Sequence, residues 1–304
     1  MPRFNPPAMT LGRIGIWTNT LDYQPAAKAQ AAAQELERMG YAAIWVPEAL
    51  RREALSNAGL LLAATSRILV ATGIANIYAR DAVTMAAGQK TLAEAYPGRF
   101  LLGLGVGHQP SVEVVRGHMY GRPVATMRAY LEAMAKAPYE SVEPTAKPPT
   151  VLAALGPKML MLAAEQTSGA HPYFVSVEHT RQARDLLGPK PLLAPEQAVV
   201  LETNPAKARD IARLHMQTYL RLPNYVNNLE RLGYTQRDLS DGGSNRLVDD
   251  IVAWGDLESV TSRIYAHLEA GADHVCVQVL AEGPKALPMV AWRTLAKHLF
   301  SSPN

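Results

Sequence analysis

The sequence has only one cysteine, Cys276, among its 304 residues. A single thiol excludes both a disulfide within the chain and a metal site built from several thiolates. Cys276 stands inside an apolar run, residues 274–280, so we expect it to be a buried strand residue rather than a nucleophile.

Long hydrophobic runs and strong charge are also missing. No stretch of about 18 uninterrupted apolar residues is present, which argues against a membrane-spanning helix. The segment Met1–Met9 lacks the charged and then apolar order of a signal peptide, so we expect a cytosolic protein. The formal charge of +3 does not indicate the clustered basic patch of a nucleic-acid-binding protein.

The eight histidines do not follow the spacing of a metal site. The H-E-x-x-H pattern is absent, and we expect no bound metal. Five of the histidines are expected at the surface: His118, His179, His215, His267 and His298.

Short apolar runs alternate with helical patterns along the whole chain. The eight candidate strands are residues 13–18, 42–48, 68–74, 100–107, 150–155, 170–175, 196–202 and 274–280. Helical spacing is clearest over residues 25–39, 54–64, 81–96 and 287–300, and after Pro123. Runs that are apolar throughout are typical of strands buried on both faces, as in a parallel sheet covered by helices.

Eight such strand–helix units predict the α/β class and a (β/α)8 TIM barrel. We expect one domain over residues 1–304, with an excursion near residues 222–250, where the pattern weakens. In this kind of barrel the working residues lie at the C-terminal ends of the strands and in the loops that follow them.

The fourth apolar run ends in alternating glycines. Gly103, Gly105 and Gly107 would expose bare backbone on one face of the strand, which lets a flat group approach closely. Small residues that only fill a tapering barrel are the alternative explanation, above all for Gly103. His108 follows the run and could exchange a proton near neutral pH.

Three other strand ends carry candidate functional residues. Leu155, Gly156, Pro157 and Lys158 close the fifth run and open a helix, whose free N–H groups and dipole favour an anion such as a phosphate. A plain helix start with an exposed lysine is the other explanation. Trp17 and Glu48 end the first and second runs, at the expected mouth of the barrel.

Taken together, these segments resemble the bacterial luciferase-like (luciferase-like monooxygenase) family, and within it the branch that depends on the deazaflavin coenzyme F420. The resemblance is carried by AQELERMGYAAIWVPE (33–48), ILVATGIANIYARDAVTMAAGQ (68–89), PGRFLLGLGVG (97–107), LGPKMLMLAAE (155–165) and AGADHVCVQ (270–278). These segments are spread over nearly the whole chain in the family's order.

The resemblance implies a place for the cofactor. Relatives hold the tricyclic ring at the barrel mouth on a bulge with a non-prolyl cis peptide bond, which corresponds here to Gly73–Ile74 within Thr72–Asn76. By the same likeness the backbone of Gly105, Val106, Gly107 and His108 lies near the ring, and Leu155–Lys158 lies near the phosphate of the cofactor tail. A homodimer is also implied.

One departure limits the likeness. The sugar-phosphate dehydrogenases of this branch carry Asp-His where this chain has Glu48-Ala49, and His108 replaces a catalytic Glu after the glycine-rich strand. We therefore do not expect this chain to oxidise glucose 6-phosphate. His108 and Glu48 are the expected catalytic residues, and Trp17, Tyr78, Tyr120 and His171 are the expected walls of the substrate pocket.

Three functions remain open at this point. The first is an F420-dependent oxidoreductase that moves a hydride to or from a small organic molecule. The second is an FMN-dependent monooxygenase of the same fold, and the third is a barrel that binds a flavin without catalysis. Substrate identity and the direction of hydride transfer cannot be read from the residues, because barrel loops diverge most where substrate binds.

Overall fold

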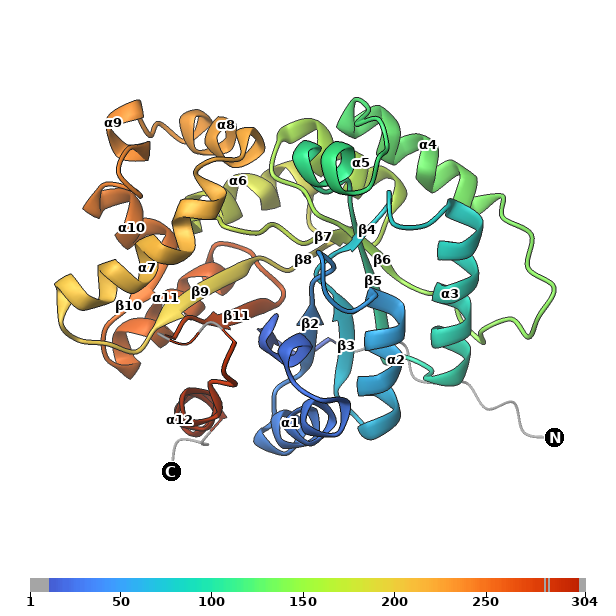
Figure 1. Cartoon of the computed structure of the whole chain (residues 1–304), viewed down its shortest axis with the longest axis horizontal. Coiled ribbons are helices and arrows are strands. Elements are labelled where there is room, and N and C mark those ends of the chain that lie inside the picture. The colour runs from blue at the N-terminus through green and yellow to red at the C-terminus, as the bar shows by residue number, and fades with distance from the viewer. Residues whose placement is uncertain (1–10, 282, 284, 301–304) are drawn as a thin grey trace.

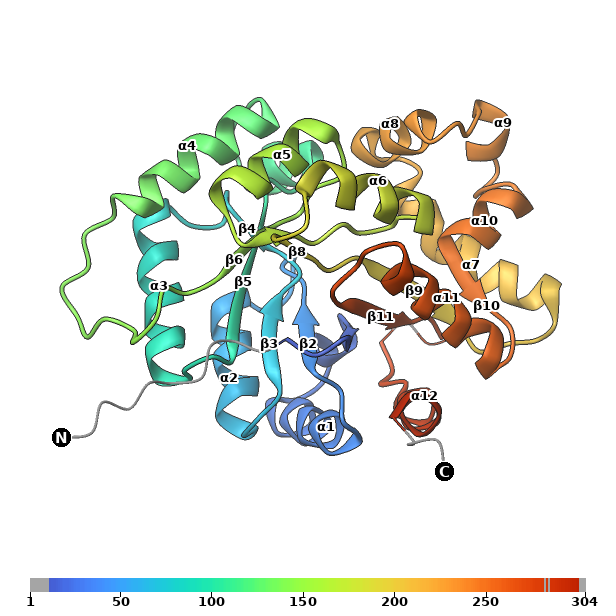
Figure 2. The same cartoon turned by 180° about the vertical axis from the view of Figure 1, so that it is seen from behind.

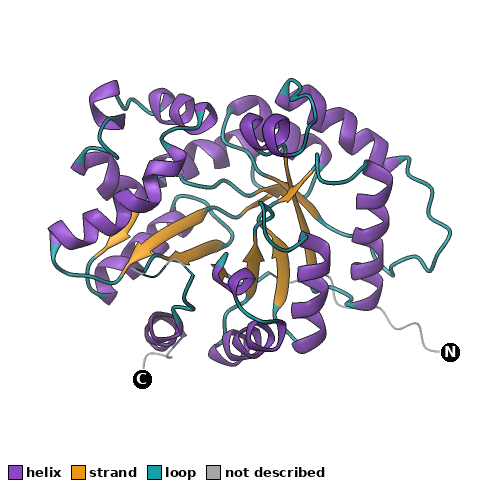
Figure 3. Cartoon of the chain, viewed as in Figure 1, coloured by secondary structure: helices purple, strands orange, loops and turns teal. Residues whose placement is uncertain are grey.

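The structure is a computed structural model that describes residues 11–281, 283 and 285–300. The segment Met1–Met9, considered above as a signal peptide, lies outside the described residues. Strands and helices alternate along the described chain, with helices on the outside and strands inside (Figure 3).

The strands are short and almost wholly buried. They are β1 (Ile14–Trp17), β2 (Ala43–Val46), β3 (Leu69–Thr72), β4 (Ala75–Asn76), β5 (Phe100–Gly105), β6 (Thr150–Leu152), β7 (Gly169–Ala170), β8 (Leu192–Leu193), β9 (Glu196–Val200), β10 (Val252–Trp254) and β11 (Val275–Val279). Seven of the eight expected runs contain a strand, which confirms the apolar runs as the strand signal, and the sixth shares only Ala170 with β7.

The helices follow the strands in turn. The α-helices are α1 (Ala26–Met39), α2 (Ala54–Ala64), α3 (Ala82–Ala95), α4 (Pro123–Ala135), α5 (Pro157–Gln166), α6 (Val177–Leu187), α7 (Pro205–Tyr219), α8 (Pro223–Arg231), α9 (Gln236–Leu239), α10 (Asn245–Ile251), α11 (Leu257–Glu269) and α12 (Met289–Phe300). A 3-10 turn, η1 (Thr20–Tyr23), and a π-helical turn, η2 (Ser111–Val115), complete the elements.

All strand pairs are parallel, and the sheet closes on itself. From β1 the pairing runs through β2, β3, β5, β6 and β7 to β8 on one side, and through β11 to β9 on the other. Because β8 and β9 are consecutive parts of the segment 192–200, that segment joins the two ends. The result is the expected α/β barrel, whose strands are surrounded by helices in both views (Figures 1 and 2).

The prediction of a sixth strand over residues 170–175 is wrong except for Ala170. Strand β7 covers only Gly169–Ala170, and the chain then leaves the ladder. Pro172 has no N–H to donate to a ladder, and Phe174 has φ of 59°, in the left-handed region that strands avoid. This early exit turns Tyr173 and Phe174 away from the sheet path.

The excursion after β9 is helical. Helices α8, α9 and α10 lie within residues 223–251, between α7 and β10. The short strand β10 was not expected from the sequence. Their inner faces pack in a cluster with Tyr225, Leu229, Leu247 and Val248. The weak sequence pattern therefore marks short helices that cap the barrel.

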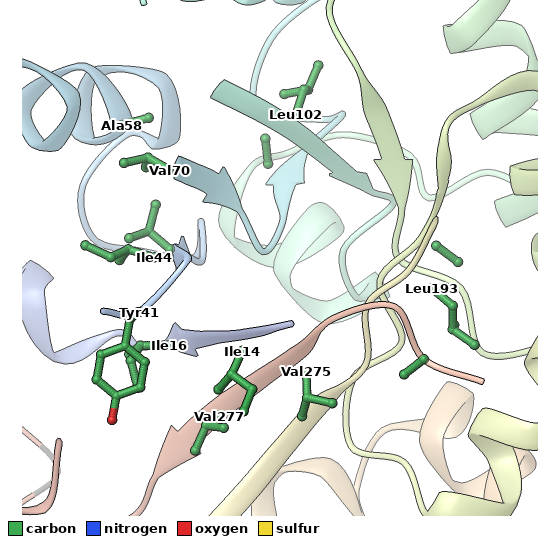
Figure 4. Packing of buried hydrophobic residues seen from close by; sticks show 14 of the residues in the cluster. Ile14, Ile16, Tyr41, Ile44, Ala58, Val70, Leu102, Leu193, Val275 and Val277 are labelled. Carbon is green, nitrogen blue, oxygen red and sulfur yellow. The ribbon is translucent and has the colours of Figure 1, made fainter. Parts of the chain in front are cut away.

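The main core lies between the barrel and its outer helices. Ile14, Ile16, Ile44, Val70 and Val277 point outward from neighbouring strands into this layer (Figure 4). Inside the barrel a separate cluster holds the opposite faces of the same strands: Trp17, Trp45, Ala71, Leu101, Val151, Ala194 and Cys276. Cys276 is buried, as expected.

Candidate functional site

A cavity of about 540 Å³ opens at the C-terminal ends of the strands. Its walls are built by Ile74, Gly105, Val106, Gly107, His108, Tyr120, Pro123, Val124, Ala153, Ala154, Leu155, Gly156, Pro157, Lys158, Met159, His171, Tyr173, Asn224, Tyr225, Asn227 and Arg231. Eleven of these were predicted as site residues: Ile74, Gly105, Val106, Gly107, His108, Tyr120, Leu155, Gly156, Pro157, Lys158 and His171. Four separate strand ends therefore converge on one hollow.

Gly73–Ile74 and Gly105–Gly107 form a shelf at the floor of the cavity, which Ile74 and Gly105–Gly107 line. The glycines of this shelf carry no side chain, whereas Ile74 and Val106 do. The Gly73–Ile74 peptide bond is cis, as the resemblance implied. A Cβ added to Gly105 would lie 2.4 Å from Ile74 Cδ1, so glycine leaves the two strands in contact at this point. Below the shelf, Trp17 Nε1 donates a hydrogen bond to Gly73 O at 3.0 Å.

Three predicted residues support the shelf rather than line the cavity: Trp17, Thr72 and Asn76. Gly73, which is part of the shelf, does not line the cavity either. Thr72 is fully buried, and its hydroxyl bonds both the N–H and the carbonyl of Gly103. A Cβ on Gly103 would come within 2.1 Å of Thr72 O, so the glycine allows β3 and β5 to approach. Asn76 lies beside Gly107, and Trp17 packs on Tyr173 with ring centroids 5.0 Å apart.

Glu48 does not face the cavity. Its carboxylate accepts from the N–H groups of Ala54 at 3.2 Å and Asn76 at 2.8 Å and is paired with Arg80. The side chain is only 4% exposed. In this structure Glu48 ties the loop after β2 to β4 and to the start of α2, which leaves its oxygens fully engaged.

His108 lines the cavity at the end of β5. Its ring lies 5.7 Å from the ring of Tyr225 in α8. Burial lowers the pKa of His108 below its ordinary value, and a hydrogen bond with Asn224 opposes that shift. Burial therefore favours the neutral imidazole, which can accept a proton.

The two cations of the cavity wall lie beside the start of α5. Gly156 is the N-cap without a side-chain bond, and Pro157 is the first helical residue. Lys158 follows, and Arg231 reaches over from α8, donating to Leu155 O at 3.2 Å. Backbone N–H groups, the helix dipole and two cations make this end of the cavity favourable for an anion.

Of the predicted pocket walls, Tyr120 and His171 line the cavity and Tyr78 does not. Tyr120 lines the cavity, and Tyr78 stacks behind it with centroids 5.9 Å apart. His171 lines the cavity from inside the barrel and stacks on Trp45 at 4.4 Å. Burial lowers the pKa of His171 to about 4, so its ring is neutral.

Half of the ten lining residues that the sequence did not predict come from α8 and from the loop after β7. Asn224, Tyr225, Asn227 and Arg231 belong to α8 and close the cavity from above. Tyr173 enters because β7 ends early. Its hydroxyl lies 2.8 Å from both Tyr219 Oη and Gln278 Oε1.

Of the five histidines expected at the surface, His118 and His298 are exposed and His215 is half-buried. The expectation was wrong for His179 and His267, which are buried. His179 is 3% exposed and bonds Leu155 O at 2.9 Å. His267 is fully buried, donates to Gln197 Oε1 and accepts from Thr180, both at 2.8 Å. Both rings face inward from their helices, where hydrogen bonds replace water.

Within the described ranges, no three His, Cys, Asp or Glu side chains gather as a metal would need. No helix in the same ranges is both long enough and apolar enough to cross a bilayer.

The profile of the luciferase-like monooxygenase family matches residues 8–274. The chain therefore belongs to the luciferase-like monooxygenase family. Among curated proteins it is 25% identical, over 221 residues, to a 5,10-methylenetetrahydromethanopterin reductase of Methanolobus tindarius. The match covers 62% of this chain and 66% of the reductase, so the chain spans just under two thirds of that relative.

Solved structures with both kinds of cofactor share the fold. An F420-dependent secondary alcohol dehydrogenase in complex with an F420–acetone adduct superposes with a TM-score of 0.72 at 16% identity, covering 95% of this chain and 97% of the other. The oxygenating constituent of 3,6-diketocamphane monooxygenase from Pseudomonas putida, in complex with FMN, gives 0.69 at 16% identity, with 95% and 96% covered. At these identities the likeness concerns the fold.

Proposed function

We propose that this protein is an F420-dependent oxidoreductase that transfers a hydride between the deazaflavin and a small, uncharged organic substrate. The observation that carries the proposal is the glycine shelf at Gly73–Ile74 and Gly105–Gly107, which forms the floor of a cavity with a cationic end. The family, and the fold shared with the F420-dependent secondary alcohol dehydrogenase, support it.

The residues present fit such a cofactor. A flat ring needs a smooth floor, and glycine at position 105 leaves room there for the Ile74 side chain, which a Cβ would meet at 2.4 Å. An anionic tail needs donors and positive charge, which α5, Lys158 and Arg231 provide at one end of the cavity. When bound, F420 would supply the hydride chemistry.

The remaining walls define what the protein itself contributes. Apart from Lys158 and Arg231, the lining carries no permanently charged side chain, which favours an uncharged substrate. The neutral His108 is placed to hold or move the proton that accompanies a hydride, at one of its ring nitrogens. Tyr120, Tyr173 and Tyr225 line the space above the shelf with aromatic rings.

The second candidate is an FMN-dependent monooxygenase, because an FMN-bound monooxygenase shares the fold over nearly the whole chain. The purified protein titrated with F420 and, separately, with FMN distinguishes the two. Trp17, bonded to Gly73, reports binding through its fluorescence. We expect F420 to bind more tightly than FMN by at least about tenfold, or about 1.4 kcal/mol. Tight FMN binding without F420 binding would favour the monooxygenase, and no hydride exchange with either reduced cofactor would leave a flavin-binding barrel.

We expect Lys158→Ala and Arg231→Ala each to weaken F420 binding about tenfold, because each removes a cation from the anionic end of the cavity. The deazaflavin nucleoside without its phosphate tail should bind wild type and both variants equally. Lys136→Ala, an exposed lysine after α4, is the matched control. Equal loss for the tail-free nucleoside would place the cofactor phosphate elsewhere.

A further inference from the structure

A second pocket lies at the same end of the barrel as the cavity. Its volume is about 490 Å³, and its walls come from the loops after β2 and β4 and from the end of η2 with the residues that follow. Among the described residues, none lines both the cavity and this pocket. We call it the arginine pocket, and its walls are Glu48, Ala49, Leu50, Arg51, Arg52, Glu53, Tyr78, Ala79, Arg80, Val115, Arg116 and His118.

Two of the four arginines in the arginine pocket are paired with carboxylates. Arg80 is ion-paired with both Glu48 and Glu53. Arg51 Nε lies 3.5 Å from Oδ2 of Asp22, whose side chain is only 1% exposed. Each of these three acids therefore already has a cation beside it.

Arg52 donates to two neutral acceptors, Gln24 O at 2.6 Å and Asn57 Oδ1 at 3.4 Å. Its charge also acts on Asp22: burial raises the pKa of this acid, and Arg51 and Arg52 oppose the rise. Four arginines are thus balanced by three acids, which leaves one positive charge in excess.

Arg116 makes no ion pair with a carboxylate of the described residues. It follows η2, and its Nη2 donates to Ala49 O at 3.2 Å. Its Nε is buried and has no hydrogen-bond partner in the part of the chain that the structure describes. A cationic N–H without an acceptor is costly, and the planar guanidinium matches the two oxygens of a carboxylate or phosphate. Arg116 therefore favours an oxyanion in the arginine pocket.

Part of the same wall is apolar. Leu50 and Val115 line the arginine pocket, yet they are 69% and 55% exposed. Exposed apolar side chains that gather beside a pocket are typical of a binding surface. Together with Arg116 they favour a ligand that has a negatively charged end and an apolar body.

An aromatic pair separates the arginine pocket from the cavity. Tyr78 lines the arginine pocket, and Tyr120 lines the cavity. Their rings stack with centroids 5.9 Å apart, and Tyr78 Oη accepts from the N–H of Gly121 at 2.9 Å. A ligand in the arginine pocket would therefore lie behind a wall of the cavity, apart from Lys158 and Arg231 at its cationic end.

We propose that the arginine pocket is a second binding site, which takes a small organic anion with an apolar body. Arg116 binds the carboxylate or phosphate group, Arg52 adds its positive charge, and Leu50 and Val115 contact the apolar part. The site is separate from the cavity, so the proposal does not rest on the choice of cofactor.

Calorimetric titrations of the full chain test the site with four probes. Phenyl phosphate and benzoate each combine an anionic group with an apolar ring, whereas inorganic phosphate lacks the ring and benzyl alcohol lacks the charge. We expect the better of the two ring-bearing anions to bind with a Kd below about 1 mM and at least about tenfold more tightly than inorganic phosphate or benzyl alcohol. Which of the two binds better identifies the oxyanion of the ligand.

Variants show where the anion binds. We expect Arg116→Gln to weaken the binding of the better probe at least about tenfold, because it removes the guanidinium that pairs with the oxyanion. Val115→Glu adds a carboxylate at an exposed position of the wall, and it should bind at least about tenfold more weakly than Val115→Gln, which has the same size without the charge. Arg128→Gln, at an exposed position in α4, is the control for a lost surface charge and should bind like wild type. Thermal unfolding checks that each variant is folded.

Lys158→Ala, which changes the cationic end of the cavity, should still bind the better probe like wild type. The proposal is overturned if none of the probes binds, if Arg116→Gln binds like wild type, or if Val115→Glu binds like Val115→Gln. Binding that is lost only in Lys158→Ala would place the anion in the cavity and overturn it as well. No titration contains F420, so a failure here and a failure of F420 binding are separate results.

Discussion

Glu196→Gln is expected to make the protein more stable at alkaline pH by on the order of 4 kcal/mol. The wild-type carboxyl has its pKa raised by burial from 4.5 to about 8 in the folded state. Glutamine keeps the shape and still accepts from the Phe174 N–H, but it carries no charge to bury.

The sign of this effect follows from proton binding. Below pH 4.5 both folded and unfolded chains hold the Glu196 proton, so the carboxyl contributes nothing to the pH dependence. Between pH 4.5 and about 8 only the folded chain keeps it, so stability falls as pH rises. Above that range both states are ionised, and the penalty stays constant.

Urea unfolding of both proteins at several pH values measures the difference directly. The free energies should agree at pH 4 to within about 1 kcal/mol and diverge up to pH 8.5. Glu132→Gln, at an exposed position in α4, should show no divergence. A constant difference between wild type and Glu196→Gln at all pH values would mean that Glu196 is not a protonated buried acid.

Gly105→Ala and Gly105→Val are expected to weaken F420 binding in steps, with the valine variant losing at least about 100-fold, or about 2.7 kcal/mol. A Cβ at position 105 lies 2.4 Å from Ile74 Cδ1 and 3.3 Å from Ala153 Cβ. Because Ile74 lines the cavity, a larger residue at position 105 that displaces its side chain would narrow the space for the ring.

Titration with F420, together with thermal unfolding, separates a filled cavity from a lost fold. Gly59→Ala in α2 is the control, since a Cβ there meets Leu92 at an ordinary 3.5 Å and alanine favours a helix. It should bind F420 like wild type. Undiminished binding by a folded Gly105→Val variant would show that the ring does not rest on this glycine.

The barrel could be predicted because its signal is local. Each parallel strand must be buried on both faces, so apolar runs such as residues 68–74 and 100–107 reveal the strands by composition alone. The wrong prediction of a strand over residues 170–175 also came from local composition. Tyr173 and Phe174 read as strand residues, but Pro172 and the positive φ of Phe174 end the ladder and release them to the cavity.

The site residues that lie at strand ends could be predicted from the sequence. The site residues that come from distant segments of the chain could not. Glycines 105 and 107, His108 and Lys158 follow their strands directly and converge as expected. Residues of α8 reach the cavity only through tertiary packing, which no local pattern encodes. Glu196 opens the apolar run 196–202 and is buried with it, whereas Glu202 at the other end of the run is not.

A crystal structure of the protein with F420 tests the central claim most directly. We expect the deazaflavin ring to lie against Gly73–Ile74 and Gly105–Gly107, with the tail phosphate within hydrogen-bond distance of Lys158 or Arg231. A ring bound away from these glycines, or a shelf covered by rearranged side chains in the complex, would contradict it.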